Sequence, residues 1–556
     1  MKTRSFGVSK FKGLLLVGCF SVSIEFLMGL TDSVVAGNLL GESALSAVNI
    51  LQPILSAVTF FAGMVGVGMG VNYAIQLGCC AERRAREIFT QGLWTVLAGG
   101  AALMLACAFF AAPFVAFMGV DAETGAYARD YLLWFAPVAL LEPLALLFLN
   151  CCYADGDKRI CFVSYAVQLA VNAAFSVVFV KAGMGTAGCA LGTLLGNVAA
   201  IAALSVHFFR KSNTFRIFRT SFGDSSAFLC LAAVQFAIAK IAVLRFGPDV
   251  LPVVSAVIIT FSCSELFDGT GAALQPVVSV YTGERNTLAV KRVLAAGLRV
   301  SLVVGVLSSI LLAVCPDVIV RLIGIDDPEV LDGARTAVRL SALSFLAFSP
   351  AGLLNSYLVT IGKEMLAVVL TVLVWFAGPL AALLVLLPIG PSSVALGLSV
   401  GSVLALVAFW AVVIARKGRR VFPHLLVGDF DRRIRMFDLR LDAQEIARTA
   451  QAVAETLKSA GADPSATMRA SLMTEEVLMA VLDRNAGRKP VLAEVTLDLN
   501  DGVKLTLRDD GEIFDITDTD QKISSLRTFL VASVMERQKT RKNMVTTGFN
   551  RNVFKF

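Results

Sequence analysis

Residues 13–38 read GLLLVGCFSVSIEFLMGLTDSVVAGN, and the acidic side chains of this run are Glu25 and Asp32. A helix needs about 20 consecutive, predominantly apolar residues to cross the hydrocarbon core of a bilayer, and this run is long enough. Charged groups inside a spanning helix are costly, and they are therefore functional candidates by default. The stretch predicts a membrane-spanning helix that carries functional carboxylates.

The composition of the whole chain supports this interpretation. The 556 residues are 56% hydrophobic and 16% charged, whereas soluble globular chains are about 45–50% apolar and about 25% charged. Residues 421–556 contain 20 basic and 20 acidic residues, so the net charge of +7 belongs to residues 1–420. This contrast excludes a single soluble enzyme, a disordered chain and a secreted disulfide scaffold. It predicts a large membrane domain followed by a small soluble one.

The sequence contains twelve apolar stretches of spanning length. They are residues 13–38, 45–77, 88–117, 128–151, 160–181, 187–209, 225–246, 250–281, 291–320, 335–360, 364–388 and 393–415. The loops on one side of the membrane hold 21 basic residues and those on the other side hold 6. Because cytoplasmic loops carry the excess of Lys and Arg, we expect a bacterial-type inner-membrane protein with both termini in the cytoplasm. The first span is too long for a signal peptide. The positive charge is therefore a topology signal, and we expect no nucleic-acid partner.

The eleven cysteines all precede residue 421, and the histidines of the chain are His207 and His424. Most cysteines lie inside apolar runs, and their spacing fits neither zinc nor haem ligation. We therefore interpret them as small apolar packing residues.

An internal repeat recurs at an offset of about 201–206 residues. Residues 68–70 (GMG) correspond to 269–271 (GTG), 119–121 (GVD) to 324–326 (GID), and 156–158 (GDK) to 362–364 (GKE). Six spans per repeat give both halves the same orientation, and such parallel repeats build two lobes around a central substrate path. The expected fold is an all-α polytopic membrane protein with twelve helices in two pseudo-symmetric six-helix lobes, residues 1–209 and 210–420.

The motifs in these spans resemble those of the multidrug and toxic compound extrusion (MATE) transporters. The resemblance rests on residues 31–41 (TDSVVAGNLLG) with 44–48 (ALSAV), on Tyr131 through Ala136-Pro137 to residues 155–157 (DGD), on Asn172 with residues 185–193 (GTAGCALGT), and on Gln275-Pro276. It covers nearly all of residues 13–415. It implies an antiporter that exports cationic or amphipathic organic compounds against a Na+ or H+ gradient.

Asp32 is the main candidate for ion coupling. Glu25 lies seven residues earlier, so the two acids fall within about 20° on one helical face and about 10.5 Å apart. A buried carboxylate can bind Na+ or take up a proton, because burial penalises its charged form. The resemblance implies that Asn172 and Thr193 share the site. Ser176 stands where many members have a second acid, which weakens the case for Na+ relative to H+.

Three further acids in the spans are transport candidates. Glu265 and Asp268 are neighbours on one helical face. They form either a salt bridge with Lys240 or a cation site in the second lobe. Glu142 precedes Pro143, which frees a backbone carbonyl and often kinks a helix, so Glu142 is a candidate for the central cavity.

After residue 420 the apolar spans give way to a mixed α/β pattern, and we call residues 421–556 the tail. Its first part, 421–436, is predicted to be a linker. We predict helices at 442–460, 465–483 and 524–537, strands at 493–499, 503–508 and 552–556, and a hairpin turn at Asn500-Asp501-Gly502.

Residues 437–556 resemble the histidine-kinase-type ATPase fold in its anti-sigma-factor serine kinase branch. The resemblance rests on Glu475-Glu476 and on residues 509–515 (DDGEIFD), and it implies nucleotide contacts at Glu475, Asp509 and Gly511. Met479 stands where the family's Mg2+-binding Asn is expected, and residues 524–527 (SSLR) lack the glycine of the phosphate-binding turn. A thioether cannot replace the hard oxygen ligand that Mg2+ requires. We therefore expect a degenerate binding or regulatory module; the alternative is a dimerising cap.

The leading hypothesis is secondary transport without enzymatic activity and without a required cofactor beyond H+ or Na+; ATP with Mg2+ at the tail is doubtful. Expected partners are membrane lipid, small organic substrates and a protein partner of the tail. Two alternatives are a lipid-linked oligosaccharide flippase, which would favour cationic residues in the cavity, and a membrane sensor that signals through a kinase-like tail.

Overall fold

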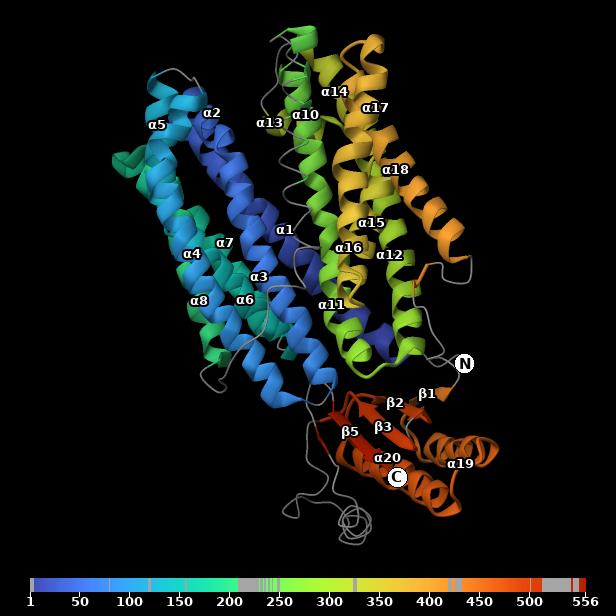
Figure 1. Cartoon of the computed structure of the whole chain (residues 1–556). Helices are drawn as coiled ribbons and strands as arrows, with labels where there is room; N and C mark the ends of the chain where they lie inside the picture. Colours follow the sequence, from blue (N-terminus) through green and yellow to red (C-terminus); the bar gives the residue numbers. More distant parts are fainter. Residues whose placement is uncertain are drawn as a thin grey trace.

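The structure is a computed structural model of the chain. It describes residues 5–79, 81–118, 122–155, 158–208, 251–323, 328–418, 423–425, 433–500, 502–512, 542–543 and 550–556, with isolated residues between 230 and 247. These residues form a helical membrane domain and a small tail in which a sheet packs with two helices (Figure 1). The predicted class, a mostly helical polytopic membrane domain followed by a small α/β tail, is confirmed.

The first lobe is built from the helices of residues 6–208. They are α1 (Phe6–Leu40), α2 (Glu42–Ile50), α3 (Gln52–Gly78), α4 (Glu82–Met118), α5 (Ala122–Phe135), α6 (Val138–Asp155), α7 (Lys158–Phe179), a π-helical turn (Val180–Met184) and α8 (Gly185–Phe208). Two predicted spans are each divided between two helices. The span at 45–77 breaks at Leu51, and the span at 128–151 breaks at Ala136-Pro137, where proline lacks the N–H that would continue the helix.

Helices of the second lobe are also interrupted by short turns. Its described elements are α10 (Leu251–Ser262), a 3-10 turn (Cys263–Phe267), α11 (Asp268–Gly283), α12 (Thr287–Val314), α13 (Asp317–Ile323), α14 (Pro328–Ala342), α15 (Phe345–Thr360), α16 (Glu364–Thr371), a π-helical turn (Val372–Ala377), α17 (Gly378–Leu386), a 3-10 turn (Leu387–Ile389) and α18 (Ser393–Lys417).

Several of these helices have the length and composition of membrane spans. Within the described residues, seven qualify, or eight if the pair 331–342 and 345–360, bent by 43°, counts as one. One of the seven, Arg159–Ser205, holds both α7 and α8, which are joined by a turn at Gly183 with φ of +86°. Large apolar side chains such as Phe109 and Val385 are 76% and 77% exposed, as lipid-facing residues would be. The count of twelve stays a prediction, because more than half of residues 225–246 lie outside the described part.

The two lobes meet through α1, α3 and α11. A Cβ added to Gly18 on α1 would lie 2.6 Å from the carbonyl oxygen of Gly269, and one added to Gly283 on α11 would lie 3.0 Å from the Cα of Gly78. Glycine at these positions therefore allows the backbones to touch. Figure 1 shows that the lobes converge toward the end of the membrane domain that carries the tail and separate toward the opposite end. We call the convergent end, where α3 ends at Gly78 and α11 at Gly283, the tail end.

The tail contains β1 (Ile434–Arg440), α19 (Ala443–Ser459), α20 (Pro464–Arg484), β2 (Leu492–Asp498), β3 (Lys504–Asp509), β4 (Lys542–Asn543) and β5 (Asn550–Lys555). The strand order is β1-β2-β3-β5-β4, with antiparallel neighbours. β1 begins inside the stretch predicted as a linker, 421–436. The predicted helix at 524–537 lies outside the described residues.

Each strand of this sheet presents one apolar and one polar face. Val495, Leu505 and Leu507 belong to an apolar core that includes Ile446 of α19 and Val477 of α20. The alternate residues of β2 and β3, among them Glu494 and Arg508, point the other way, because successive side chains of a strand face opposite sides. That polar face lies against the tail end of the membrane domain (Figure 1).

Candidate functional site

The Asp32 carboxylate lies inside the first lobe, where it is only 5% exposed. Tyr131 of α5 donates its hydroxyl hydrogen to Oδ2 over 2.7 Å. Thr193 of α8 donates to the same carboxylate, with Oγ1 3.0 Å from Oδ2 and 3.3 Å from Oδ1. Three helices of one lobe therefore converge on a single buried acid.

A chain of polar side chains continues from this acid between α7 and α8. Asn172 donates its amide hydrogen to Thr193 Oγ1 over 3.0 Å, and the hydroxyl of Ser176 lies 3.4 Å from Asn172 Oδ1. The two helices approach closely because of Gly192, where any Cβ would overlap the Ser176 hydroxyl. The structure thus brings together Asp32, Asn172, Ser176 and Thr193.

The chemistry of this cluster suits a small cation or a proton. Its oxygen atoms belong to one carboxylate and to neutral hydroxyls and amides. Within the described residues, no group of three or more His, Cys, Asp or Glu side chains could hold a metal ion. A deprotonated carboxylate only accepts hydrogen bonds, so the two hydroxyl donors fit the charged form of Asp32.

Tyr131 is the residue of this cluster that the sequence reasoning did not select as a site residue. It lies 99 positions from Asp32 in the chain and is fully buried. It belongs to the stretch 131–137 that contributes to the family resemblance, but no spacing rule connects it to α1. Only the packing of α5 within the first lobe shows the contact.

Glu142 lies in a separate place on α6. Thr59 of α3 donates its hydroxyl hydrogen to Glu142 Oε1 over 3.0 Å, and the side chain is half-buried. This acid therefore faces α3 within the first lobe, next to the proline at 143.

The remaining transport candidates are only partly described. Glu25 lies on α1, Glu265 in the 3-10 turn before α11, and Asp268 at the first position of α11, and the side chains of all three lie outside the described part. Lys240, their proposed salt-bridge partner, lies outside it entirely. The predicted second-lobe cation site stays a prediction.

The nucleotide candidates of the tail lie in different environments. Glu475 is exposed on α20, whereas Asp509 at the end of β3 is 1% exposed. The Asp509 carboxylate accepts hydrogen bonds from the Gly511 backbone N–H (3.1 Å) and from Asn550 (2.8 Å), and burial raises the pKa of Asp509 to about 6. Met479 packs against the apolar core of the tail. Residues 524–527 lie outside the described part, so a nucleotide site stays a prediction.

Comparisons with known proteins identify the family to which the membrane domain is similar. A family model described as MatE matches residues 19–178 and 226–384, which is more than half of the chain. The chain is 22% identical over 194 residues to the multidrug export protein MepA of Staphylococcus aureus (strain MSSA476); the match covers 34% of this chain and 42% of MepA. The match therefore spans less than half the length of this curated relative.

Two solved structures share the fold. One is a crystal structure of MATE in complex with MaL6, 17% identical, with a TM-score of 0.68 over 74% of this chain and 97% of that one. The other is a MOP superfamily transporter from Pyrococcus furiosus, described by a reverse polarity of its binding pocket, 17% identical with a TM-score of 0.68 over 74% and 96% of the chains. The family match ends at residue 384, before the tail begins.

Proposed function

The chain belongs to the MatE family of membrane transporters, and from that premise we propose that it exports organic cations in exchange for protons, with Asp32 as the coupling site. The observation that carries the proposal is the buried Asp32 carboxylate, which receives hydrogen bonds from Tyr131 and Thr193. The 21-to-6 bias of basic loop residues supports a cytoplasmic position for both termini and the tail.

A proton fits this site better than Na+ because the cluster holds a single carboxylate. Ser176 occupies the position where a second acid would strengthen Na+ coordination, and its hydroxyl instead lies within hydrogen-bond distance of Asn172. Protonation needs no further ligand. It converts Asp32 from a pure acceptor into a group that also donates, so one of the two hydroxyl donors must turn away or accept.

This change of hydrogen bonding would act on the helix that joins the lobes. Asp32 lies in the second half of α1, among helices of the first lobe, whereas Gly18 in the first half of α1 contacts Gly269 of the second lobe. A rearrangement around Asp32 therefore alters how α1 sits between the lobes. That is the structural requirement for alternating access by two lobes around a central path.

The test is gradient-driven transport in proteoliposomes that contain the purified protein and a fluorescent cation such as ethidium. We expect uptake with an imposed proton gradient, little with a Na+ gradient, and loss of gradient-driven uptake in Asp32→Asn. Tyr131→Phe removes one hydrogen bond to a charged group, an interaction of about 1.5–3 kcal/mol, and should slow transport about tenfold or more.

The control variant is Glu123→Gln, which neutralises an exposed carboxylate in the first turn of α5. It should transport at the wild-type rate. Equal rates for wild type and Asp32→Asn would overturn the assignment of the coupling site. Transport driven by Na+ alone would overturn the choice of ion. Uptake of lipid-linked sugars in place of cations would favour the flippase alternative.

A further inference from the structure

The polar face of the tail sheet carries a row of four charged residues. Asp438 of β1 pairs with Glu494 of β2, Glu494 with Arg508 of β3, and Arg508 with Arg551 of β5, each directly opposite the next in the strand register. The row therefore reads acid, acid, base, base across four strands. We call these four residues the charge row. Glu494, Arg508 and Arg551 are each at most 1% exposed, so the row is covered.

Two like charges directly opposite each other on neighbouring strands destabilise a sheet. The charge row contains two such neighbours, the acids Asp438 and Glu494 and the bases Arg508 and Arg551. Glu494 and Arg508 form an ion pair with each other, but burial of Arg551 and partial burial of Asp438 without partners would cost several kcal/mol for each ion. The arrangement therefore needs compensating groups from outside the tail.

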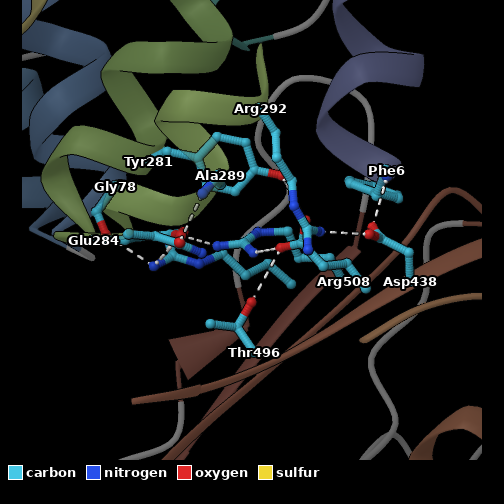
Figure 2. A network of polar contacts seen from close by, with 12 residues as sticks. Phe6, Gly78, Tyr281, Glu284, Ala289, Arg292, Asp438, Thr496 and Arg508 are labelled. Carbon is cyan, nitrogen blue, oxygen red and sulfur yellow. Dashed lines mark hydrogen bonds and ion pairs between the residues drawn. The ribbon is translucent and has the colours of Figure 1, made fainter. Parts of the chain in front are cut away.

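The membrane domain supplies a partner for every member of the charge row. Figure 2 shows Arg292 reaching Asp438, and Glu284 near Arg508. Arg292 of α12 pairs with Asp438 over 2.8 Å, and Tyr281 of α11 donates its hydroxyl hydrogen to Glu494 over 2.8 Å. Glu284, the residue after α11, forms ion pairs with both arginines of the row. All three partners belong to the second lobe.

Arg551 also reaches the first lobe. Its guanidinium donates to the carbonyl oxygen of Leu77 over 3.1 Å and to that of Gly78 over 2.8 Å, at the end of α3, while it pairs with Glu284 Oε1 over 2.8 Å. A single side chain of the tail thus binds both lobes at the point where α3 and α11 touch. The first lobe could not move away from the second at this end without breaking these contacts.

The start of α1 is bound to the tail as well. The Phe6 backbone N–H donates to Asp438 over 2.8 Å, and the Lys10 ammonium lies 3.4 Å from Asp510. The tail therefore contacts α1, α3, and the α11–α12 turn. These elements surround the convergent end of both lobes.

We propose that the tail is an intramolecular clamp that holds the membrane domain closed at the tail end, and that the transporter opens there only when the charge row separates from its partners. The clamp acts through Arg551, which contacts both lobes, and through Glu284, which forms ion pairs with both arginines of the charge row. The charged face of the tail is thus specific for its own membrane domain. The inference rests on the two-lobed transporter architecture and not on the coupling role of Asp32.

The experiment measures the distance between the lobes at the tail end in the full-length protein. Spin labels are placed at Arg84 in α4 and at Arg285 between α11 and α12, both exposed, in a background where cysteines 79, 80 and 315 are serine. Pulsed electron spin resonance then reports closed and open populations without substrate or gradient. Hydrogen exchange of β3 and β5 reports separately whether the tail is docked.

We expect a predominantly short distance in the parent protein, and in Arg551→Gln about a tenfold larger long-distance population, a factor typical of coupling between sites. Glu284→Gln alters only the membrane side of the contact and should act in the same direction, so the test does not depend on the folding of β5. The matched control is Arg488→Gln, which removes an ion pair to Glu512 inside the tail and should leave the distances unchanged.

An unchanged distance distribution in both Arg551→Gln and Glu284→Gln would overturn the clamp: with the tail released, docking does not hold the lobes closed, and with the tail still docked, these two residues do not hold it. Failure of Asp32-dependent transport would leave this distance measurement unaffected. The two proposals therefore fail independently.

Discussion

Replacing Arg508 by glutamine should weaken the docked tail by about 3–5 kcal/mol, the range found when one partner of a buried ion pair is removed. Arg508 and Glu494 are both 0% exposed and form an ion pair, and the Arg508 guanidinium also pairs with Glu284 and lies 4.9 Å from the centre of the Tyr281 ring. Without the arginine, Glu494 is left in register with Asp438, another acid. Tyr281 and Thr496 still donate to Glu494, but burial raises the pKa of Glu494 to about 8, so the carboxylate that has lost its arginine must either stay charged in a buried site or take up a proton, and both cost free energy.

A second substitution tests this explanation. Glu494→Gln removes the stranded charge and keeps an amide oxygen that can accept from Tyr281, so the double variant Arg508→Gln/Glu494→Gln should be more stable than Arg508→Gln alone. Groups in contact commonly show interaction energies of about 0.5–3 kcal/mol, and we expect the upper part of that range here. The sign of the stability change from Arg508→Gln to the double variant decides the test, because two unrelated destabilising substitutions would make the double variant less stable than Arg508→Gln.

Native-state hydrogen exchange of the full-length protein gives the readout. A loss of about 3 kcal/mol corresponds to roughly 150-fold faster exchange of the β2 and β3 amides if they exchange through release of the tail. Arg488→Gln, in which a 59% exposed arginine loses a surface ion pair, is the control and should change exchange little. If the effects of Arg508→Gln and Glu494→Gln simply add, the two side chains do not act as a buried pair and the reasoning is refuted.

Two further predictions concern the lobe contact and the tail. Gly78→Val should shift the membrane domain toward opening at the tail end, since an added Cβ would overlap the carbonyl oxygen of Val280, and the same spin labels would detect a longer distance; an unchanged distance would show that the helices tolerate the side chain. Burial raises the pKa of Asp509 to about 6, above the model-peptide value of about 3.9, so the tail should lose stability as pH rises from about 4 through 6. Asp509→Asn should flatten that dependence and stabilise the tail at pH 7, as thermal unfolding monitored on the tail would show, whereas an unaltered pH profile would contradict it.

Local sequence patterns predicted much of the fold, because spanning helices and strands report their own burial through hydropathy and alternation. The hairpin at Gly502, whose φ is +89°, and the tail helices follow from such short-range signals. Broken spans were harder: the sequence alone did not divide 45–77 at Leu51, because an apolar run continues through the break. Asp32 stood out as an acid in an apolar helix, but its contact with Tyr131 depends on how distant helices pack.

The sequence alone did not predict the charge row, because this feature also depends on how distant segments pack. The alternation of β2 and β3 places Glu494 and Arg508 on the polar face of the sheet, and a polar face normally indicates exposure to water. Only their coverage by Tyr281 and Glu284 shows that the face is an interface. A balanced count of acids and bases in the tail cannot distinguish the two cases, because the relevant quantity is which charges are opposed in register.

The same helix connects the coupling site to the clamp. α1 contacts the tail at Phe6 and Lys10, the second lobe at Gly18, and the polar cluster of the first lobe at Asp32. If ion binding at Asp32 shifts the equilibrium between closed and open lobes, thermodynamic linkage requires that release of the tail shift the affinity of Asp32 for the ion by the same factor. Arg551→Gln should therefore change the ion concentration at which transport is half-maximal through that affinity, although Arg551 and Asp32 belong to different domains. A change in maximal rate alone, with ion affinity constant, would mean that the tail gates access without being coupled to the ion site.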